Sequence, residues 1–212
     1  MPYRVHSLLL AAVLAWAPFH AGAAGCAKPA YPRASLRNME EGITLLGFLI
    51  RTDGSVGDTV VLNSSGHPAL DTAARDALSK CVFKPARRNG EPVEQWVPVA
   101  YKWWIDGDQG MNRAKRDALT LAEAGDAGAL YHLSLLYAAT AQTDAEREAA
   151  LAGLRSAAEQ GHAHAMFELA RRYDKGDGMP PDAGEALGWY RQSADKGDVL
   201  AIQHLKNSAP AH

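Results

Sequence analysis

The sequence is poor in the residues and motifs that mark enzymes and cofactor-binding proteins. It has only two cysteines among 212 residues, and it contains no phosphate loop, no cysteine pair at zinc-ligand spacing and no cofactor fingerprint. The formal net charge of −2 gives no sign of a nucleic-acid partner. We therefore expect no catalytic residue, no cofactor and no bound metal, and we look for protein-binding surfaces instead.

The apolar run near the start is too short to cross a membrane. It extends over 12 residues from Leu8 to Phe19, whereas a spanning helix needs about 20. Arg4 precedes it and the small residues 21–23 follow it, which is typical of an export signal. We predict a cleaved signal peptide over residues 1–24, a periplasmic mature chain and no stable transmembrane anchor. Lipid attachment at Cys26 is the alternative, because residues 23–26 resemble a lipoprotein cleavage box with Ala where Leu is usual.

Two cysteines in an exported chain predict one disulfide, between Cys26 and Cys81. Closing a loop of this length stabilises a domain by about 4 kcal/mol in the chain-entropy model. The alternative is a buried free thiol at Cys81 with a lipidated or unpaired Cys26.

Residues 25–106 show the pattern of a small domain that mixes strands and helices. We expect strands over 43–51 and 56–63, with a turn over 52–55 between them, and a long strand over 92–105 after the Asn89-Gly90 turn. Between the second and the last strand, apolar residues repeat at helical spacing. This stripe consists of Leu70, Ala73, Ala74, Ala77, Leu78 and Cys81.

These elements resemble the C-terminal domain of the TonB family over residues 26–105. The residues that carry the resemblance are Tyr31-Pro32, Asp53-Gly54-Ser55-Val56, Ser64-Ser65-Gly66, Leu70-Asp71, Ala73-Ala74, Phe83, Pro85, Gly90 and Pro92-Val93. The resemblance implies an α+β fold, a three-stranded antiparallel sheet with two helices on one face. It also implies a non-catalytic periplasmic domain that holds extended segments of outer-membrane receptors by adding a strand to its sheet.

The last strand is the expected docking strand. Pro98 has no backbone donor, which favours an edge or bulged position. We expect a receptor segment to pair between residues 93 and 101, and the candidate contacts are Val93, Gln95, Val97, Val99 and Tyr101. The opposite face of this strand presents Trp96, Ala100, Lys102 and Trp104. That face is either a seam with the rest of the chain or a receptor site, and we favour the seam.

The chain beyond residue 106 is predicted to be a polar linker over 107–112 and a helical repeat domain over 113–212. Gly125, Gly161 and Gly197 are separated by 36 residues each, and Ala and Leu positions keep the same step. A period in the mid-thirties indicates stacked helix pairs. The repeat region over about 113–207 resembles the Sel-like repeats, which are relatives of the tetratricopeptide family. The copy that matches best extends from Ala165 to Gly197. Two whole units and two half units predict an all-α solenoid of about six helices.

Sel-like repeats bind proteins or scaffold assemblies, and two readings stay open here. The repeats bind a partner, or they only brace the neighbouring domain. If they bind, the candidate contacts are four first-helix positions that we take to lie outside the core: Tyr131, Leu135, Phe167 and Arg171.

Two clusters of polar residues suggest a catalytic triad and a metal site, but their spacing in the sequence argues against both. Ser64, Ser65, His67 and Asp71 lie along one turn that enters a helix, whereas the members of a triad converge from separate elements. His162 and His164 are two residues apart on a helix, so their side chains diverge and we expect solvated histidines.

We therefore favour a non-enzymatic periplasmic adaptor for envelope proteins linked to outer-membrane transport. The alternative is an energy-transducing TonB-type component, which would require an inner-membrane anchor and a proline-rich spacer that the sequence does not predict. A repeat-scaffold hydrolase is a third possibility, and no residue pattern supports it.

Overall fold

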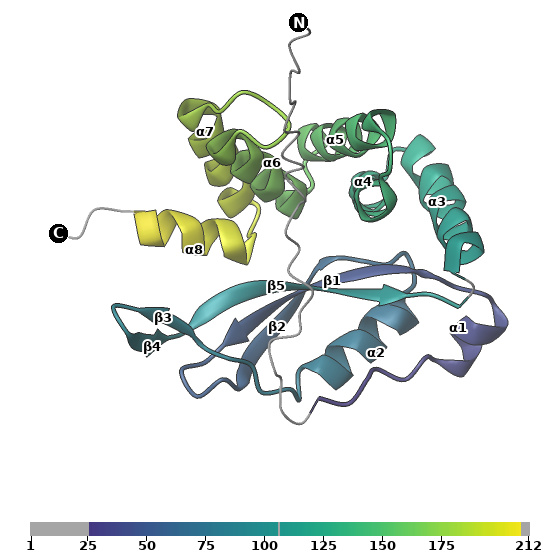
Figure 1. Ribbon diagram of the computed structural model, residues 1–212, viewed down its shortest axis with the longest axis horizontal. Helices are drawn as coiled ribbons and strands as arrows, with labels where there is room; N and C mark the ends of the chain where they lie inside the picture. Colours follow the sequence, from purple (N-terminus) through teal and green to yellow (C-terminus); the bar gives the residue numbers. More distant parts are fainter. Residues whose placement is uncertain (1–25, 106, 209–212) are drawn as a thin grey trace, which may run out of the picture.

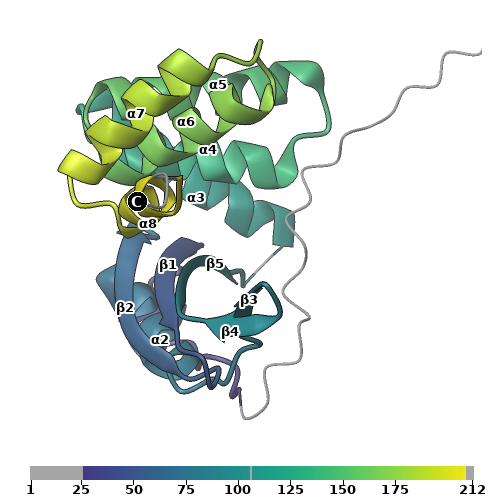
Figure 2. The ribbon, with the colours of Figure 1, turned by 90° about the vertical axis from the view of Figure 1, so that its left-hand side faces the viewer.

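The computed structural model describes residues 26–105 and 107–208. The signal peptide predicted for residues 1–24 lies outside this range. The described chain forms three layers: helix α2 (Pro68–Leu78) lies under a sheet, and six helices from α3 to α8 cover its other face (Figures 1 and 2). The predicted α+β domain followed by an all-α repeat domain is confirmed.

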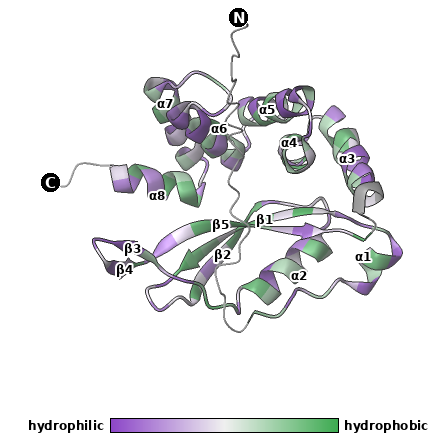
Figure 3. Cartoon of the chain, viewed as in Figure 1, coloured by the Kyte–Doolittle hydropathy of each residue, from purple (hydrophilic) through white to green (hydrophobic). Residues whose placement is uncertain are grey.

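The sheet has three antiparallel strands in the order β2-β1-β5. They are β1 (Gly42–Ile50), β2 (Val56–Asn63) and β5 (Gln95–Trp103), and the short helix α1 (Arg33–Arg37) precedes them. The expected strand over 92–105 is interrupted, because β4 (Glu91–Val93) pairs with β3 (Ala86–Arg88) in a separate hairpin. This hairpin is mostly hydrophilic and projects away from the sheet (Figure 3).

Strand β1 is central in the sheet and is buried on both faces. Leu46, Phe48 and Ile50 share one hydrophobic cluster with residues of α2. Ile43 and Leu45, which alternate with them, belong to a second cluster that is formed mainly by the repeat helices. A continuous apolar strand such as Ile43–Ile50 is expected where both faces of a sheet are covered.

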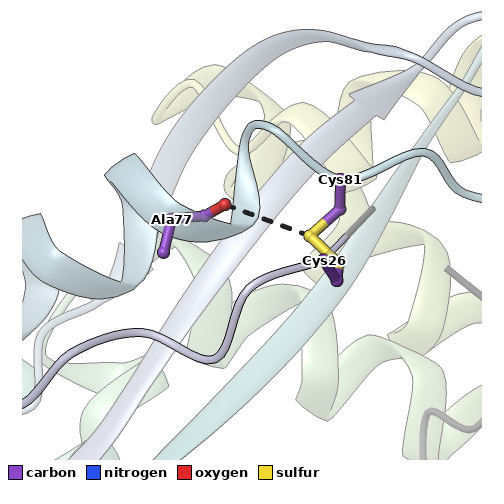
Figure 4. The surroundings of a disulfide bond; sticks show 3 residues. All are labelled: Cys26, Ala77 and Cys81. Atoms are coloured by element: carbon purple, nitrogen blue, oxygen red, sulfur yellow. Dashed lines mark hydrogen bonds between the residues drawn. A yellow bond between two sulfur atoms is a disulfide. The ribbon is translucent and has the colours of Figure 1, made fainter. Parts of the chain in front are cut away.

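The predicted disulfide joins Cys26 to Cys81 with a Cα–Cα distance of 4.7 Å (Figure 4). Helix α2 ends at Leu78, so Cys81 lies just beyond the helix and not at the end of its stripe as expected. The Cys81 side chain is buried in the cluster beneath the sheet. The bond therefore ties the start of the described chain to the centre of the first domain.

The repeat helices are α3 (Gly107–Glu123), α4 (Ala127–Thr140), α5 (Asp144–Glu159), α6 (Ala163–Lys175), α7 (Ala183–Asp195) and α8 (Val199–Ser208). The predicted glycines follow α3, α5 and α7, where they adopt left-handed backbone angles with φ of 87°, 92° and 87°. Only glycine takes this conformation without steric cost, which explains the 36-residue spacing of the three glycines.

The polar linker expected over 107–112 is helical, because α3 begins at Gly107. The glycine at position 110 permits a close contact and does not interrupt the helix. A Cβ atom on Gly110 would lie 1.9 Å from Oε1 of Glu41, whose carboxylate is buried and bonded to Arg113 at 2.7 Å. The first repeat helix is thereby held directly against the end of the sheet.

Candidate protein-interaction surfaces

The seam between the two domains covers the second face of β5, as we favoured from the sequence. Ala100 and Trp104 pack against the cluster that contains Leu136, Leu154 and Met166 of the repeats. On the opposite face, Val99 and Trp103 are buried in the cluster with α2. The alternation along β5 therefore separates the core of the first domain from the interdomain seam.

A buried histidine of the repeats forms a hydrogen bond across the seam to the first domain. Nε2 of His132 on α4 accepts the backbone N–H of Ile43 at 3.1 Å, just beyond the point where β2 stops pairing with β1. Burial lowers the pKa of His132 to about 4, and nearby Asp71 raises it less than burial lowers it. The neutral ring is the form that accepts this hydrogen bond.

The outer edge of β5 is partly capped by the last repeat helix. Oε1 of Gln203 accepts the N–H of Trp96 at 2.6 Å, and its Nε2 donates to the Trp96 carbonyl at 3.0 Å. Backbone groups of alternate residues point to the same side of a strand. The backbone N–H and carbonyl groups of Trp96 point away from β1. The backbone groups of Pro98, Ala100 and Lys102 therefore point away from β1 as well.

This alternation revises the role of the predicted β5 contacts. Gln95, Val97, Val99 and Tyr101 direct their backbone groups toward β1, with which they are in register. Val93 lies in the hairpin opposite Ala86. A strand added at this edge would pair with the intervening residues, from Pro98 to Lys102. Pro98 occupies an outward position, where its missing N–H removes no bond of the sheet.

Two of the predicted repeat contacts are core residues. Tyr131 and Leu135 are only 2% and 7% exposed and belong to the cluster that the repeats share with β1. The prediction that they lie outside the core is wrong. The Tyr131 ring lies 5.0 Å from His162 and 5.7 Å from His164, measured between centroids, so the start of α6 packs against it.

Phe167 and Arg171 on α6 are less buried. The Phe167 ring lies 5.7 Å from Tyr190 and 5.5 Å from His164, measured between centroids. Arg171 is ion-paired with Glu168 at 2.9 Å, and both side chains are partly exposed. The Arg171 side chain is 27% exposed, so part of it is accessible to a partner.

The two clusters that we rejected as catalytic or metal-binding hold the fold together. Asp71 accepts the Thr44 hydroxyl at 2.7 Å and the Ser65 N–H at 2.9 Å, and it also accepts the Ser64 hydroxyl. Its two carboxylate oxygens therefore fix the turn that enters α2. Within residues 26–105 and 107–208 no group of three or more His, Cys, Asp or Glu side chains is arranged to hold a metal.

The expectation that His162 and His164 are solvated is wrong. Nδ1 of His164 lies 2.8 Å from Oδ2 of Asp198, and both side chains are at most 2% exposed. His162 caps α6, since its Nδ1 accepts the N–H of Ala165 at 3.1 Å. One signal for this arrangement was present in the sequence. Asp126, His162 and Asp198 follow the 36-residue step, and all three cap a repeat helix.

Two sequence families cover most of the described chain. Residues 27–103 match the family of the Gram-negative bacterial TonB protein C-terminal, and residues 163–198 match the Sel1 repeat. The chain therefore joins a TonB C-terminal domain to Sel1-type repeats. Neither family is enzymatic, and both mediate interactions between proteins.

One relative is similar to about a third of the chain. Protein tonB2 of Pseudomonas aeruginosa is 38% identical over 71 residues, which is 34% of this chain and 26% of that protein. The chain thus spans about a quarter of the length of this relative. TonB homologues are proteins of the cell envelope and periplasm. In the described part of the chain, no helix is both long and apolar enough to cross a membrane.

Two solved structures each match part of the chain. The crystal structure of a Sel1 repeat protein from Oxalobacter formigenes matches with a TM-score of 0.42 and 29% identity, over 45% of this chain and 71% of that one. The solution structure of the Pseudomonas aeruginosa TonB C-terminal domain matches with a TM-score of 0.35 and 27% identity, over 40% of this chain and 86% of that one.

Proposed function

We propose that this protein is a non-enzymatic periplasmic adaptor that holds an extended segment of an envelope protein on the outer edge of β5. The observation that carries the proposal is the position of β5. It is the last strand of the TonB-type sheet, and it pairs with β1 on one side only. The partner that the family match supports best is an exposed segment of an outer-membrane receptor.

The geometry favours pairing between Pro98 and Lys102. The outward backbone groups there are the carbonyls of Pro98, Ala100 and Lys102 and the N–H groups of Ala100 and Lys102. An extended peptide gains affinity from such main-chain hydrogen bonds, and side chains next to the strand add specificity. The exposed Lys102 ammonium would favour a partner with a carboxylate nearby.

The repeats support this site as a brace and offer a second contact surface. The seam residues hold α4 against the sheet, so the repeats stiffen the strand that receives the partner. We propose that Arg171, together with the exposed part of Phe167, contacts the body of the same partner. Replacing Arg171 by Ala tests this better than a double replacement, because Phe167 packs on Tyr190 and its loss would loosen the helix pair.

The test is amide hydrogen exchange of the mature chain with a synthetic peptide that copies the exposed segment of an outer-membrane receptor. We expect slower exchange at Ala100 and Lys102 when the peptide binds. Ala100→Pro removes an outward N–H without removing a bond to β1, so it should abolish this protection. Protection confined to the repeat helices would contradict the proposal.

Export through the predicted signal peptide and oxidation of Cys26 with Cys81 are parts of the same proposal. The disulfide supports it, because such bonds persist in oxidising compartments. The second candidate function is energy transduction, which the similarity to Pseudomonas aeruginosa tonB2 favours. The two candidates differ in whether an inner-membrane motor protein contacts this chain.

A further inference from the structure

The opposite edge of the sheet borders a groove that both domains line. Strand β2 is the other outer strand, and the repeat helices lie above the sheet (Figure 2). The first residues of α4, α6 and α8 line hollows beside β2. Two hollows, of about 440 and 480 Å³, lie along this edge. Both are lined by Val61, Leu62 and His162, so they adjoin, and we call the two hollows together the β2 groove.

The β2 groove exposes backbone groups that a strand would pair with. Val60 and Asp58 are in register with Gly47 and Leu49, the β1 residues whose backbone groups point toward β2. The intervening residues Thr59 and Val61 therefore direct their groups outward. The Thr59 N–H is bonded to the Asp58 side chain at 2.7 Å, whereas the Val61 groups face the groove.

One end of the β2 groove provides an apolar site with a buried donor. Val61 and Leu121 line it and are 44% and 48% exposed, which is unusual for large apolar side chains. His132, only 4% exposed, lines the same hollow. Because its Nε2 accepts the Ile43 N–H, the neutral ring carries its proton on Nδ1.

The other end of the β2 groove is positively charged. The Lys196 ammonium lies over Gly161, where an added Cβ atom would be 3.2 Å from Nζ. Within the described residues Lys196 forms no ion pair, and the carboxylate that lines this hollow, Asp198, is already bonded to His164. The free cation at this end favours an anionic group on whatever fills the groove.

We infer that the β2 groove is a second peptide-binding site, and that it takes an extended partner segment with one carboxylate. The segment would pair with Val61, place an apolar side chain beside Leu121 and direct its carboxylate to Lys196. The site requires both domains, because β2 supplies the backbone edge and the repeats supply the walls and the charge. It is independent of the proposed site on β5, which lies on the opposite edge of the sheet.

The experiment uses two acetylated and amidated heptapeptides of alternating valine and threonine, with one glutamate at the first or last position. Binding to the mature chain is followed by nuclear magnetic resonance of the backbone amides. We expect one of the two peptides to shift the signals of Val61, Leu62, Gly161 and Gly197. The same peptides with lysine in place of glutamate should bind about tenfold more weakly, the usual effect of losing a charge-assisted hydrogen bond.

Three variants separate this site from the β5 edge. Val61→Pro removes an outward N–H at β2, and Ala100→Pro does the same at β5, so each is the matched control for the other. We expect Val61→Pro to abolish binding and Ala100→Pro to leave it unchanged. Lys196→Glu, a surface change that spares the fold, should also weaken binding of the glutamate peptide.

Several outcomes would overturn the inference. Shifts at Ala100 and Lys102 that disappear in Ala100→Pro would assign the peptides to β5. Equal affinity for the glutamate and lysine peptides would show that Lys196 does not select the ligand. If neither glutamate peptide shifts any amide at the groove at millimolar concentration, the groove is not a strand-binding site.

Discussion

Gln203 imitates a neighbouring strand for Trp96. Its side-chain amide accepts the Trp96 N–H at 2.6 Å and donates to the Trp96 carbonyl at 3.0 Å, which are the two bonds that a paired residue would make. The last repeat helix therefore closes one end of the β5 edge and leaves the stretch from Pro98 to Lys102 for a partner. An edge strand that is partly covered in this way is also protected from unwanted pairing.

Replacing Gln203 by Ala should open this end of the edge. We expect faster amide exchange at Trp96 and a loss of about 1–3 kcal/mol in the free energy of unfolding, since two hydrogen bonds disappear. A receptor-derived peptide should then protect Trp96 in addition to Ala100. Gln192→Ala, an exposed position on α7, is the control and should change neither quantity. Unchanged exchange at Trp96 would contradict the capping role.

The stability of the protein should fall as the pH drops from about 6.5 toward 4. Burial lowers the pKa of both His132 and His162 to about 4. Above pH 6.5 these rings are neutral in the folded and unfolded chain, so they make no pH-dependent contribution. Below pH 6.5 the two histidines are protonated in the unfolded chain but stay neutral in the folded chain. The free energy of unfolding therefore falls until the pH reaches their pKa in the folded protein.

For His132 alone this loss amounts to about 3 kcal/mol, because burial lowers its pKa from 6.5 to about 4. Urea unfolding at pH 7 and at pH 4.5 measures it. His132→Gln keeps an acceptor for the Ile43 N–H but does not titrate, so its unfolding free energy should change less between the two pH values. An identical pH dependence in both proteins would show that His132 is not the cause.

Gly110→Ala should destabilise the protein although alanine favours helices. The new Cβ would meet the buried Glu41 carboxylate at 1.9 Å, so α3 or the carboxylate must move. We expect a loss of about 1–3 kcal/mol, as for other overpacked sites. Gly188→Ala on α7 is the matched control, because its Cβ would meet open space. There the change should stabilise by up to about 1 kcal/mol. Equal thermal shifts for the two variants would contradict the close contact at Gly110.

The disulfide should contribute much of the stability of the first domain. Removing it by Cys26→Ala should cost about 4 kcal/mol, because the bond closes a long loop of the unfolded chain. Intact mass of the exported protein should be two hydrogens below the reduced value. A diacylglyceryl group on Cys26 would instead show that this residue is a lipid anchor and that the bond does not form in cells.

Strands β1 and β2, helix α2 and the repeat helices were predictable because each has local signals, whereas the β3-β4 hairpin was not predicted. Turn residues separate β1 from β2, and the three repeat glycines adopt the backbone angles that their spacing predicted. Both faces of β5 were also assigned correctly, since side chains alternate strictly along a strand. These properties depend on residues that are close in the sequence.

The predictions that were wrong, and the contact that was missed, concern residues that are far apart in the sequence and meet only in the folded chain. Tyr131 and Leu135 have the spacing of exposed first-helix residues, yet both are buried in the cluster that the repeats share with β1. The glycine at position 110 suggested a linker, whereas it allows α3 to pass over Glu41. The cap that Gln203 places on Trp96 joins residues 107 positions apart, and no local pattern marks it.

Site-specific photo-crosslinking in living cells tests the central claim most directly. A photoreactive phenylalanine replaces Lys102 on the outer edge of β5, and the same residue replaces Lys80, beyond α2, as the control. The account predicts an adduct between position 102 and an outer-membrane receptor, which is lost when Ala100→Pro is added, and no such adduct from position 80. Adducts from position 102 with inner-membrane motor proteins alone, or none with any outer-membrane protein, would contradict the adaptor function.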